Sequence, residues 1–590
     1  MLNAHRPTTA LISLLGLLGL ARPAEALIKA DFTPVDLVAK ADSIVAASAA
    51  VDAENDSLTL TYAKPLKGQT PTIAALDVSE LAEDEQFAWQ LESKTLPVIV
   101  FAGDFSQAAA DARSAAVGAL HLGSEWYAIV PAGKGHKLAA DKLDLKAVWH
   151  GGHEPLLAAV NYVLSARNPI VRVTAGVQWK DVQTVGAYQG TAGQPAWTVS
   201  SDGPEVYLPA TGGDKLLTFT DGKLEVIDQP AKSKLVTRID IDADGQGDWI
   251  VSDGKTISVA GKTLRKLADA PDGLLEMAPI DWKGTAALLL TAETIQILTA
   301  DGQIAPALAG QVKGITASRI GDVNGDGAAD LLLLTAEKLY VALREKDGTF
   351  GKLTEAAETY GIAFNQIRLA DFDADKDLDV LLSGPVDYGL TILANDGKGA
   401  FSDVLTEGGE IGYHGAGSIA VSQLCDINHD GLVDIILVPA AAGPKVFFNR
   451  GFRTFGYARE MDLGATEIEG ASAISSAAAQ AALAVDLTGD DAQDLLIAAA
   501  GKLHLLARDS QGPKLGVLVS LAPRAAGPVT VHAPDTDRQL SSRVVTADKP
   551  VLIGKTTRGP LELSWQGPAG AGSKKLMVFR PLQYGIQPTE

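Results

Sequence analysis

The feature that most constrains this chain is a nine-residue, Asp-rich segment that recurs between apolar stretches. The clearest copy covers residues 322–330 (DVNGDGAAD) and runs directly into Leu331–Leu334. Four further copies have Asp at their first and ninth positions and an apolar stretch behind them; they cover residues 240–248, 371–379, 426–434 and 486–494. A unit that recurs in this way predicts a fold built from similar modules that pack against their neighbours.

The spacing of the copies indicates further, degenerate units. Residues 240 and 322 are 82 positions apart, and a degenerate copy, Asp281-Trp282-Lys283-Gly284-Thr285, lies midway between them. The successive gaps are then 41, 41, 49, 55 and 60 residues. A weaker copy, in which residues 187–190 run into 197–199, would bring the number of units to seven.

Three of the units also contain a turn followed by an aromatic residue. These segments end at Phe350, Phe401 and Phe455, which lie 28, 30 and 29 residues after the first Asp of their loops. The Asn and Gly residues of the segments supply the positive φ angles of tight hairpins. We therefore expect four short strands per unit; in one unit these are 315–321, 331–335, 338–343 and a strand after Phe350. Such units are typical of a β-propeller, because a ring of small sheets buries faces that one sheet leaves exposed.

The loops have the chemistry of a site for a hard cation. Asp or Asn at positions 1, 3 and 5 directs three oxygens at one centre, and Gly at position 6 permits a sharp turn. A backbone carbonyl at position 7 and the carboxylate at position 9 complete a set that suits Ca²⁺. Solvated Asp-Gly turns are the alternative, but five copies in one register disfavour it. EF-hands do not fit, because position 12 is apolar in every copy and a strand follows.

The loops and the strands that follow them resemble FG-GAP or VCBS repeats, the calcium-binding propeller blades also found in integrin α-subunits. The resemblance covers roughly residues 175–510, and it implies a seven-bladed β-propeller with Ca²⁺ in the blade hairpins. Carried over position by position, it implies side-chain ligands at Asp240, Asp242, Asp244 and Asp248; Asp322, Asn324, Asp326 and Asp330; Asp371, Asp373, Asp375 and Asp379; Asp426, Asn428, Asp430 and Asp434; and Asp486, Thr488, Asp490 and Asp494. The backbone oxygens at position 7 would come from Gln246, Ala328, Asp377, Leu432 and Ala492.

Two of these five implied calcium sites depart from the pattern. Lys376 and Asp491 replace the Gly at position 6, and Thr488 replaces an acid or amide at position 3. We expect the sites at 371–379 and 486–494 to be weaker, and the degenerate copies near Asp281 and Ala187 to bind nothing. The expected role of the metal is structural, because only the folded loop binds the ion.

The N-terminus has the pattern of a secretory signal peptide. Arg6 precedes an apolar run, Ala10–Ala21, and Ala24-Glu25-Ala26 offers small residues for cleavage after Ala26. A buried helix of the first domain is the alternative. We expect residues 1–26 to be removed and the protein to be secreted, in a periplasm or outside the cell. No later apolar run is long enough for a membrane span.

The regions on either side of the repeats are expected to form separate domains. Residues 27–170 read as a small α+β or barrel-like domain, with a helix from Thr33-Pro34 through Lys40, strands at 43–50, 57–62, 96–101 and 126–130, and a helix at 154–166. The repeats occupy 171–511. Residues 512–590 read as a C-terminal β domain that resembles ASPIC/UnbV domains in its order of strands and its Trp565-Gln566-Gly567-Pro568 segment. The usual Trp-Pro-Ser-Gly of that family is not intact there.

Charge and missing motifs narrow the function. The net charge of −22 would repel a phosphate backbone, so we expect no nucleic-acid partner. The single Cys425 excludes an internal disulfide and, in an apolar strand, predicts a packed thiol. His150 and His153 form the one His pair, and we interpret it as a polar helix entry, since a zinc site needs further ligands.

The sequence contains no nucleophile elbow, P-loop, His-Glu-x-x-His or dinucleotide fingerprint, and we identify no catalytic residue. The first hypothesis is therefore a secreted calcium-binding propeller that acts as a binding or adhesion module for a protein or glycan. The alternative is a calcium-dependent carbohydrate-active enzyme, a polysaccharide lyase or hydrolase, with residues from separate blades. A purely structural envelope component is the third possibility.

Overall fold

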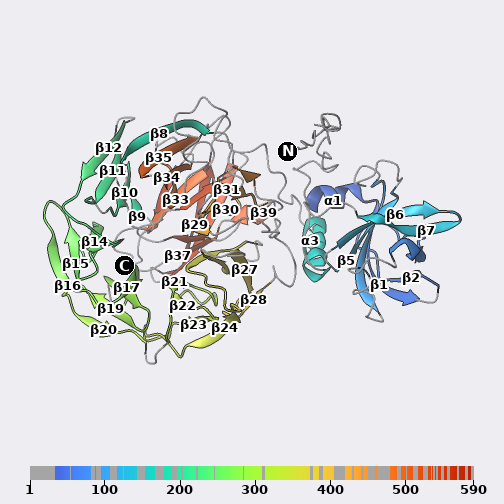
Figure 1. Ribbon diagram of the computed structural model, residues 1–590, viewed down its shortest axis with the longest axis horizontal. Helices are drawn as coiled ribbons and strands as arrows, with labels where there is room; N and C mark the ends of the chain where they lie inside the picture. The colour runs from blue at the N-terminus through green and yellow to red at the C-terminus, as the bar shows by residue number, and fades with distance from the viewer. Residues whose placement is uncertain are drawn as a thin grey trace, which may run out of the picture.

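The computed structural model is mainly β (Figure 1). It describes residues 34–586 with gaps, the longest of which are 106–115, 143–152, 166–178, 188–195, 404–418, 450–458 and 461–478; shorter gaps remove parts of four Asp-rich loops. The expected signal peptide, residues 1–26, lies outside the described residues. No helix in the described part of the chain has the length and apolar character needed to cross a bilayer.

The N-terminal region is a closed barrel with helices packed on it. The barrel order is β1-β2-β3-β7-β6-β5-β4. Its elements are α1 (Pro34–Lys40), β1 (Ser43–Asp52), β2 (Ser57–Tyr62), β3 (Ala75–Asp77), the 3₁₀ turn η1 (Ser79–Leu81), β4 (Leu96–Ala102), β5 (Gly118–Leu122), β6 (Glu125–Ala132), β7 (Gly135–Lys142) and α3 (His153–Ser165). Neighbouring residues of β1 serve two cores: Val45 packs inside the barrel, and Ile44 packs with Leu37 of α1 and Leu156 of α3. The sequence analysis expected an α+β or a barrel-like domain here, and the sheet is a closed barrel.

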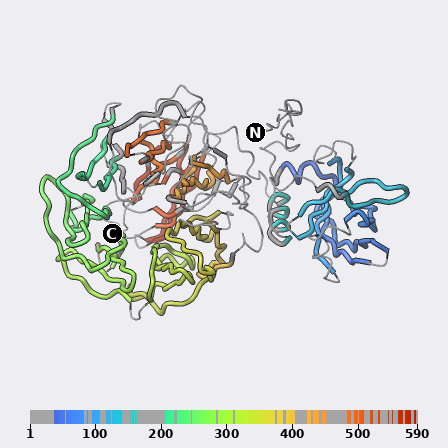
Figure 2. The backbone as a smooth tube through the Cα atoms, in the orientation of Figure 1, coloured from blue at the N-terminus to red at the C-terminus, as the bar shows by residue number. Residues whose placement is uncertain are grey.

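The repeat region forms small sheets that follow one another around a ring (Figures 1 and 2). The strands of the first four sheets are β9 (Ala196–Ser200), β10 (Gly203–Leu208), β11 (Lys215–Thr220) and β12 (Lys223–Asp228); β13 (Leu235–Ile239), β14 (Asp248–Ser252), β15 (Thr256–Ala260) and β16 (Arg265–Asp269); β17 (Leu274–Asp281), β18 (Thr285–Thr291), β19 (Ile295–Thr299) and β20 (Ile304–Pro306); and β21 (Ala317–Gly321), β22 (Asp330–Leu334), β23 (Lys338–Ala342) and β24 (Thr354–Glu358). The next strands are β25 (Gln366–Ala370), β26 (Asp379–Ser383), β27 (Leu390–Asn395) and β28 (Phe401–Asp403); β29 (Ile419–Cys425), β30 (Asp434–Pro439), β31 (Lys445–Phe447) and β32 (Arg459–Glu460); and β33 (Ala479–Val485), β34 (Asp494–Ala499) and β35 (Lys502–Arg508). The first strand of each sheet contacts the first strand of the next, so these are the inner strands of the ring.

Packing between neighbouring sheets explains the continuous apolar strands. In β22, Leu331 and Leu333 pack against the sheet before it, with Leu288 and Ile297. Leu332 and Leu334 pack against the sheet after it. Because side chains alternate across a strand, a strand covered on both faces needs apolar residues at every position. The run of four leucines therefore reflects a sheet that is buried between two others.

The ring is closed by a strand whose partner the sequence did not reveal. Strand β8 (Trp179–Ala187) pairs antiparallel with β35, and Ala187 lies opposite Lys502. Strand β9 begins the next sheet, so Ala187 and residues 197–199, which we expected in one unit, belong to different sheets. An apolar strand has the same pattern whichever partner it pairs with, and this partner lies more than 300 residues away along the chain.

The C-terminal region is β structure joined to the ring. Its strands are β36 (Gly516–Leu521), β37 (Val529–His532), β38 (Pro534–Asp535), β39 (Arg538–Gln539), β40 (Arg543–Val545), β41 (Val551–Gly554), β42 (Gly559–Gln566), β43 (Gly572–Val578) and β44 (Leu582–Ile586). They form a β41-β36-β44 sheet, a β38–β39 pair and a β40-β37-β42-β43 sheet whose edge pairs with β25, where Ala370 lies opposite Arg543. Val544 packs in the core between two sheets of the ring. Figure 1 places β37 inside the ring.

Candidate metal centre and channel pocket

The Asp-rich loops share a hydrogen bond that closes each of them. The N–H of the second loop residue donates to a carboxylate oxygen of the ninth, as in Val323 to Asp330 (3.0 Å). The same bond joins Ile241 to Asp248 (3.2 Å), Phe372 to Asp379 (3.0 Å), Ile427 to Asp434 (2.9 Å) and Leu487 to Asp494 (3.0 Å). Position 9 therefore holds the loop in shape through the backbone, in addition to any ligand role.

The ninth residue also fixes the hairpin between the second and third expected strands of its unit. The other oxygen of Asp330 accepts from the N–H of Arg344 (2.8 Å), and Asp379 accepts from that of Asn395 (3.0 Å). Asp434 accepts from Asn449 in the same way (2.9 Å). Asp330, Asp379 and Asp434 are fully buried, and these bonds satisfy both of their oxygens at least once.

Positions 1, 3 and 5 come together in the loop at 240–248. Carboxylate oxygens of Asp240, Asp242 and Asp244 all lie within 4.8 Å of one another, with Asp240 buried and the other two exposed. The N–H of Asp244 donates to Asp240 (3.0 Å) and to Asp242 (3.3 Å), which fixes the group. Three carboxylates at this separation repel one another, and hard oxygens in such a group fit Ca²⁺. Asp248, the fourth implied side-chain ligand, is not part of the group.

The loop at 322–330 is described in full and repeats this arrangement. Asp322 accepts from the N–H groups of Gly325 (2.8 Å), Asp326 (3.2 Å) and Gly327 (2.8 Å). The side-chain oxygen of Asn324 accepts from the N–H of Asp326 (3.0 Å). The backbone thus positions the oxygens of positions 1 and 3 before any ion binds.

Burial makes the negative charges of this loop costly. Burial raises the pKa of Asp330 to about 7, and the charges of Asp322 and Asp326 act in the same direction against two backbone hydrogen bonds. Burial also raises the pKa of Asp322. A bound cation would offset both effects, so the donor set of this loop fits a divalent ion.

Position 6 has the backbone conformation that the sequence analysis expected. Gly327 has φ +87° and Gly431 has φ +90°. Lys376 adopts φ +87° at the same position, where a side chain is strained. Its N–H donates to Asp371 (3.0 Å), as that of Gly431 does to Asp426 (2.9 Å). The turn is therefore kept without Gly, at a cost in backbone strain.

The remaining implied ligands are only partly placed. Asp371 and Asp426 are buried at the first positions of their loops, and Asp494 is buried at the ninth position of the last. Outside the described residues lie Asp373, Asp375, Asn428, Asp430, Thr488, Asp490 and Ala492. Of the expected His pair, His153 is the first residue of α3, and His150 is outside the described residues. Cys425 is buried in β29, as expected.

Two asparagines that the sequence analysis treated only as turn residues connect neighbouring units. The side-chain amide of Asn395 donates to the carbonyl of Val323 in the preceding loop (2.8 Å). That of Asn449 donates to the carbonyl of Phe372 (3.1 Å). Their recurrence at the start of the turn segments was the available signal.

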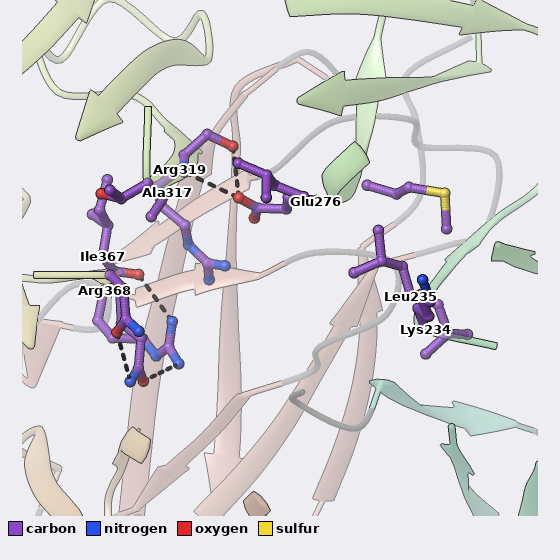
Figure 3. Close-up of a pocket in the computed structure, with 14 residues that line it drawn as sticks. Lys234, Leu235, Glu276, Ala317, Arg319, Ile367 and Arg368 are labelled. Carbon is purple, nitrogen blue, oxygen red and sulfur yellow. Dashed lines mark hydrogen bonds between the residues drawn. The ribbon is translucent and has the colours of Figure 1, made fainter. Parts of the chain in front are cut away.

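The structure also shows a pocket that the sequence analysis missed. Its volume is 260 Å³, and it is lined by residues in or next to the inner strands β13, β17, β21 and β25 (Figure 3). Arg319 and Arg368 project from two of these strands, each three residues before the first Asp of its loop. An arginine at the same distance before two of the Asp-rich loops was the signal that could have identified them.

Comparisons with known proteins found a family-model match over part of the chain. No curated protein is similar to this chain at a significant level. Among solved structures, BBS1N in complex with ARL6DN aligns at 12% identity, 57% coverage of this chain and 99% of the other, and TM-score 0.38. An Agrocybe aegerita lectin that recognises non-reducing terminal N-acetylglucosamine aligns at 14% identity, covering 63% of this chain and 100% of the lectin, with TM-score 0.38. Streptogramin B lyase aligns at 14% identity, covering 56% of this chain and 97% of the lyase, with TM-score 0.37. The family model of the FG-GAP-like repeat matches residues 322–382 and 371–437.

Proposed function

We propose that this chain is a secreted, calcium-stabilised, seven-bladed β-propeller that acts as a binding or adhesion module. The observation that carries the calcium assignment is the group formed by Asp240, Asp242 and Asp244, whose oxygens lie within 4.8 Å of one another. An acidic group of this kind is stable at neutral pH when a cation neutralises it. The fully described loop at 322–330 has the same backbone hydrogen bonds and supports the assignment independently.

The seven-bladed arrangement is supported by strand order. The sheets that begin with β9, β13, β17, β21, β25, β29 and β33 follow one another, and β8 supplies the fourth strand of the last. We propose that residues 171–511 form this propeller, between an N-terminal domain at 27–170 and a C-terminal domain at 512–590. Cleavage after Ala26 would leave Leu27 as the first residue, which N-terminal sequencing of secreted material tests.

The role proposed for the metal is structural. The loops join the inner strand of a sheet to its second strand, and Asn395 and Asn449 link neighbouring units through the second residue of a loop. An ion that binds only the folded loop stabilises the folded state by mass action. The proposed calcium ions would therefore stabilise the folded ring.

Calcium counting tests this assignment. We expect EDTA to lower the melting temperature, and Asp326→Ala to reduce the calcium bound per chain, measured by equilibrium dialysis, by about one ion. Asp272→Ala is the matched control, because Asp272 is exposed and lies outside the loops. No calcium uptake by the purified full chain, together with an unfolding curve that EDTA leaves unchanged, would refute the proposal.

The binding role is favoured over the carbohydrate-active enzyme by the composition of the pocket. Glycoside hydrolysis commonly uses two carboxyl groups on either side of the scissile bond. Among the lining residues that the structure describes, Glu276 is the only carboxylate. Turnover of acidic polysaccharides by the purified chain, abolished by a single carboxylate substitution, would instead support the enzyme.

A further inference from the structure

The pocket at the inner strands concentrates positive charge in an acidic protein. The chain has a net charge of −22, yet the charged residues that line the pocket are Lys234, Arg319, Arg368 and Glu276. Clefts lined by one sign of charge attract ligands of the opposite sign. This local reversal indicates an anionic ligand.

Arg319 is the cation that most needs a partner. Its Nε is buried and has no hydrogen-bond partner, and no hydrogen bond or ion pair joins its guanidinium to any residue that the structure describes. Figure 3 draws its side chain between those of Glu276 and Arg368, and no dashed line reaches it. Glu276 instead accepts from the N–H (3.0 Å) and the hydroxyl (2.8 Å) of Ser318. A buried donor without a partner is costly, so its presence at a pocket points to a ligand.

Arg368, in contrast, is held in place by the protein. Its Nε and one terminal nitrogen donate to the carbonyl of Ser422 (3.2 and 3.1 Å), and its other terminal nitrogen donates to the carbonyl of Ile367 (3.0 Å). Burial, followed by the charge of Arg319, lowers the pKa of Arg368 to about 9, against the opposite effect of Glu276. The group stays protonated at neutral pH, so two cations face one pocket. An oxyanion between them would relieve their repulsion.

The dimensions and the other lining groups restrict the ligand further. A volume of 260 Å³ lies below the ~300–1,000 Å³ of most small-molecule pockets, so the ligand is small. Glu276 offers a carboxylate oxygen to ligand hydroxyl groups, and Leu235, Met277 and Ile367 add apolar surface. A simple inorganic anion would leave the apolar surface unused.

We propose that this pocket binds a small acidic sugar unit, of the size of a uronic acid, whose carboxylate lies against Arg319 and whose hydroxyl groups face Glu276. The proposal rests on the binding role proposed above but not on calcium. Gln366 and Ile367 line the pocket at the start of β25, whereas Ala370, at the end of the same strand, pairs with β40 and precedes Asp371. Ligand and metal sites thus lie at opposite ends of the inner strand.

Calorimetric titration of the full chain tests the proposal, with D-glucuronate, D-galacturonate, D-glucose and inorganic phosphate as probes in a calcium-containing buffer. We expect at least one uronate to bind, and glucose and phosphate to bind at least tenfold more weakly. Arg319→Met should weaken uronate binding at least tenfold, as expected for loss of a hydrogen-bonded charge. Arg265→Met, an exposed arginine on β16, is the matched control and should leave affinity unchanged.

The stability of the Arg319 variants distinguishes a ligand-binding role from a structural one, because loss of a structural residue would lower the melting temperature. Because its guanidinium lacks a partner among the described residues, Arg319→Met should fold with an unchanged or raised melting temperature. Arg319→Lys, which keeps the charge and loses the planar fork, should bind with intermediate affinity. Asp326→Ala should lose calcium and retain uronate binding, which separates failure of this proposal from failure of the calcium assignment.

Three results would overturn the proposal. The first is the absence of binding by both uronates, and the second is equal uronate affinity in the wild type and Arg319→Met. The third is phosphate binding as tight as that of a uronate, which would mark a simple oxyanion site and exclude the acidic-sugar class.

Discussion

The loop at 322–330 and the degenerate junction at Asp281-Trp282 perform the same connection with different chemistry. Each leads from an inner strand to the second strand of its sheet. In the acidic loop, the carbonyl of Val323 accepts a hydrogen bond from the side-chain amide of Asn395 in the next unit (2.8 Å). At the degenerate junction, the guanidinium of Arg344 lies 5.0 Å from the ring centroid of Trp282 and 4.9 Å from that of Phe350.

The difference teaches that ring topology does not itself require a metal. A cation stacked on aromatic rings stabilises one junction without a cluster of carboxylates. The acidic loops bury negative charge, and we therefore expect their stability to depend on a bound cation and on pH. The comparison can be tested at several residues, from the largest expected effect to the smallest.

Asp330→Ala should have the largest effect on stability. It leaves the buried N–H group of Val323 and the partly buried N–H group of Arg344 without their acceptor, at about 1–3 kcal/mol for each unsatisfied group. We expect the free energy of unfolding, measured by urea denaturation, to fall by about 3 kcal/mol with EDTA present. An unchanged stability would mean that position 9 does not hold the loop closed.

Trp282→Ala should destabilise the ring without altering its response to calcium. The half-buried ring packs 5.8 Å from that of Phe350, and its loss removes the contact with Arg344 as well. We expect a loss of about 2 kcal/mol. The loss should be equal in EDTA and in calcium; a difference between the two conditions would show that this junction is coupled to the metal sites.

Stability without calcium should fall as the pH rises towards 7. Because the pKa of Asp330 is raised from 3.8 to about 7 in the folded protein, its contribution is complete below pH 3.8 and is lost as the pH rises through about 7. The slope is at most about 1.4 kcal/mol per pH unit. Urea denaturation in EDTA from pH 5 to 8 measures it, and calcium should stabilise more at pH 8 than at pH 5. Asp330→Asn should flatten the dependence; an unchanged slope would assign it to other groups.

Lys376→Gly should give the smallest change, a gain in stability. Gly adopts φ +87° without strain, and the exposed Lys376 side chain offers little packing to lose. Gly also raises the entropy of the unfolded chain, which lowers stability, but the relief of strain is larger. We therefore expect the free energy of unfolding to rise by about 0.5–1 kcal/mol. Gly431→Ala, at φ +90°, is the reciprocal variant and should destabilise. Thermal unfolding of both variants measures the effect, and a lower melting temperature for Lys376→Gly would contradict it.

Much of the fold could be predicted from the sequence because its signals are local. The strand expected at 57–62 is β2, and the strands expected around the loop at 322–330 are β21, β22 and β23 with small shifts at their ends. The positive φ at position 6 and the gathering of Asp240, Asp242 and Asp244 follow from nine-residue segments. Whether an ion binds there stays a prediction.

The sequence by itself determined the repeated loop, its turn and the strands beside it, because the interactions that form them join residues close together in the chain. Only the tertiary structure decided that β8 completes the sheet of β35, that β40 pairs with β25 and that Arg319 and Arg368 face one pocket. Strand pairing over hundreds of residues leaves no local pattern, since the same apolar strand suits many partners. The energy of a buried charge likewise depends on the neighbours that the fold supplies.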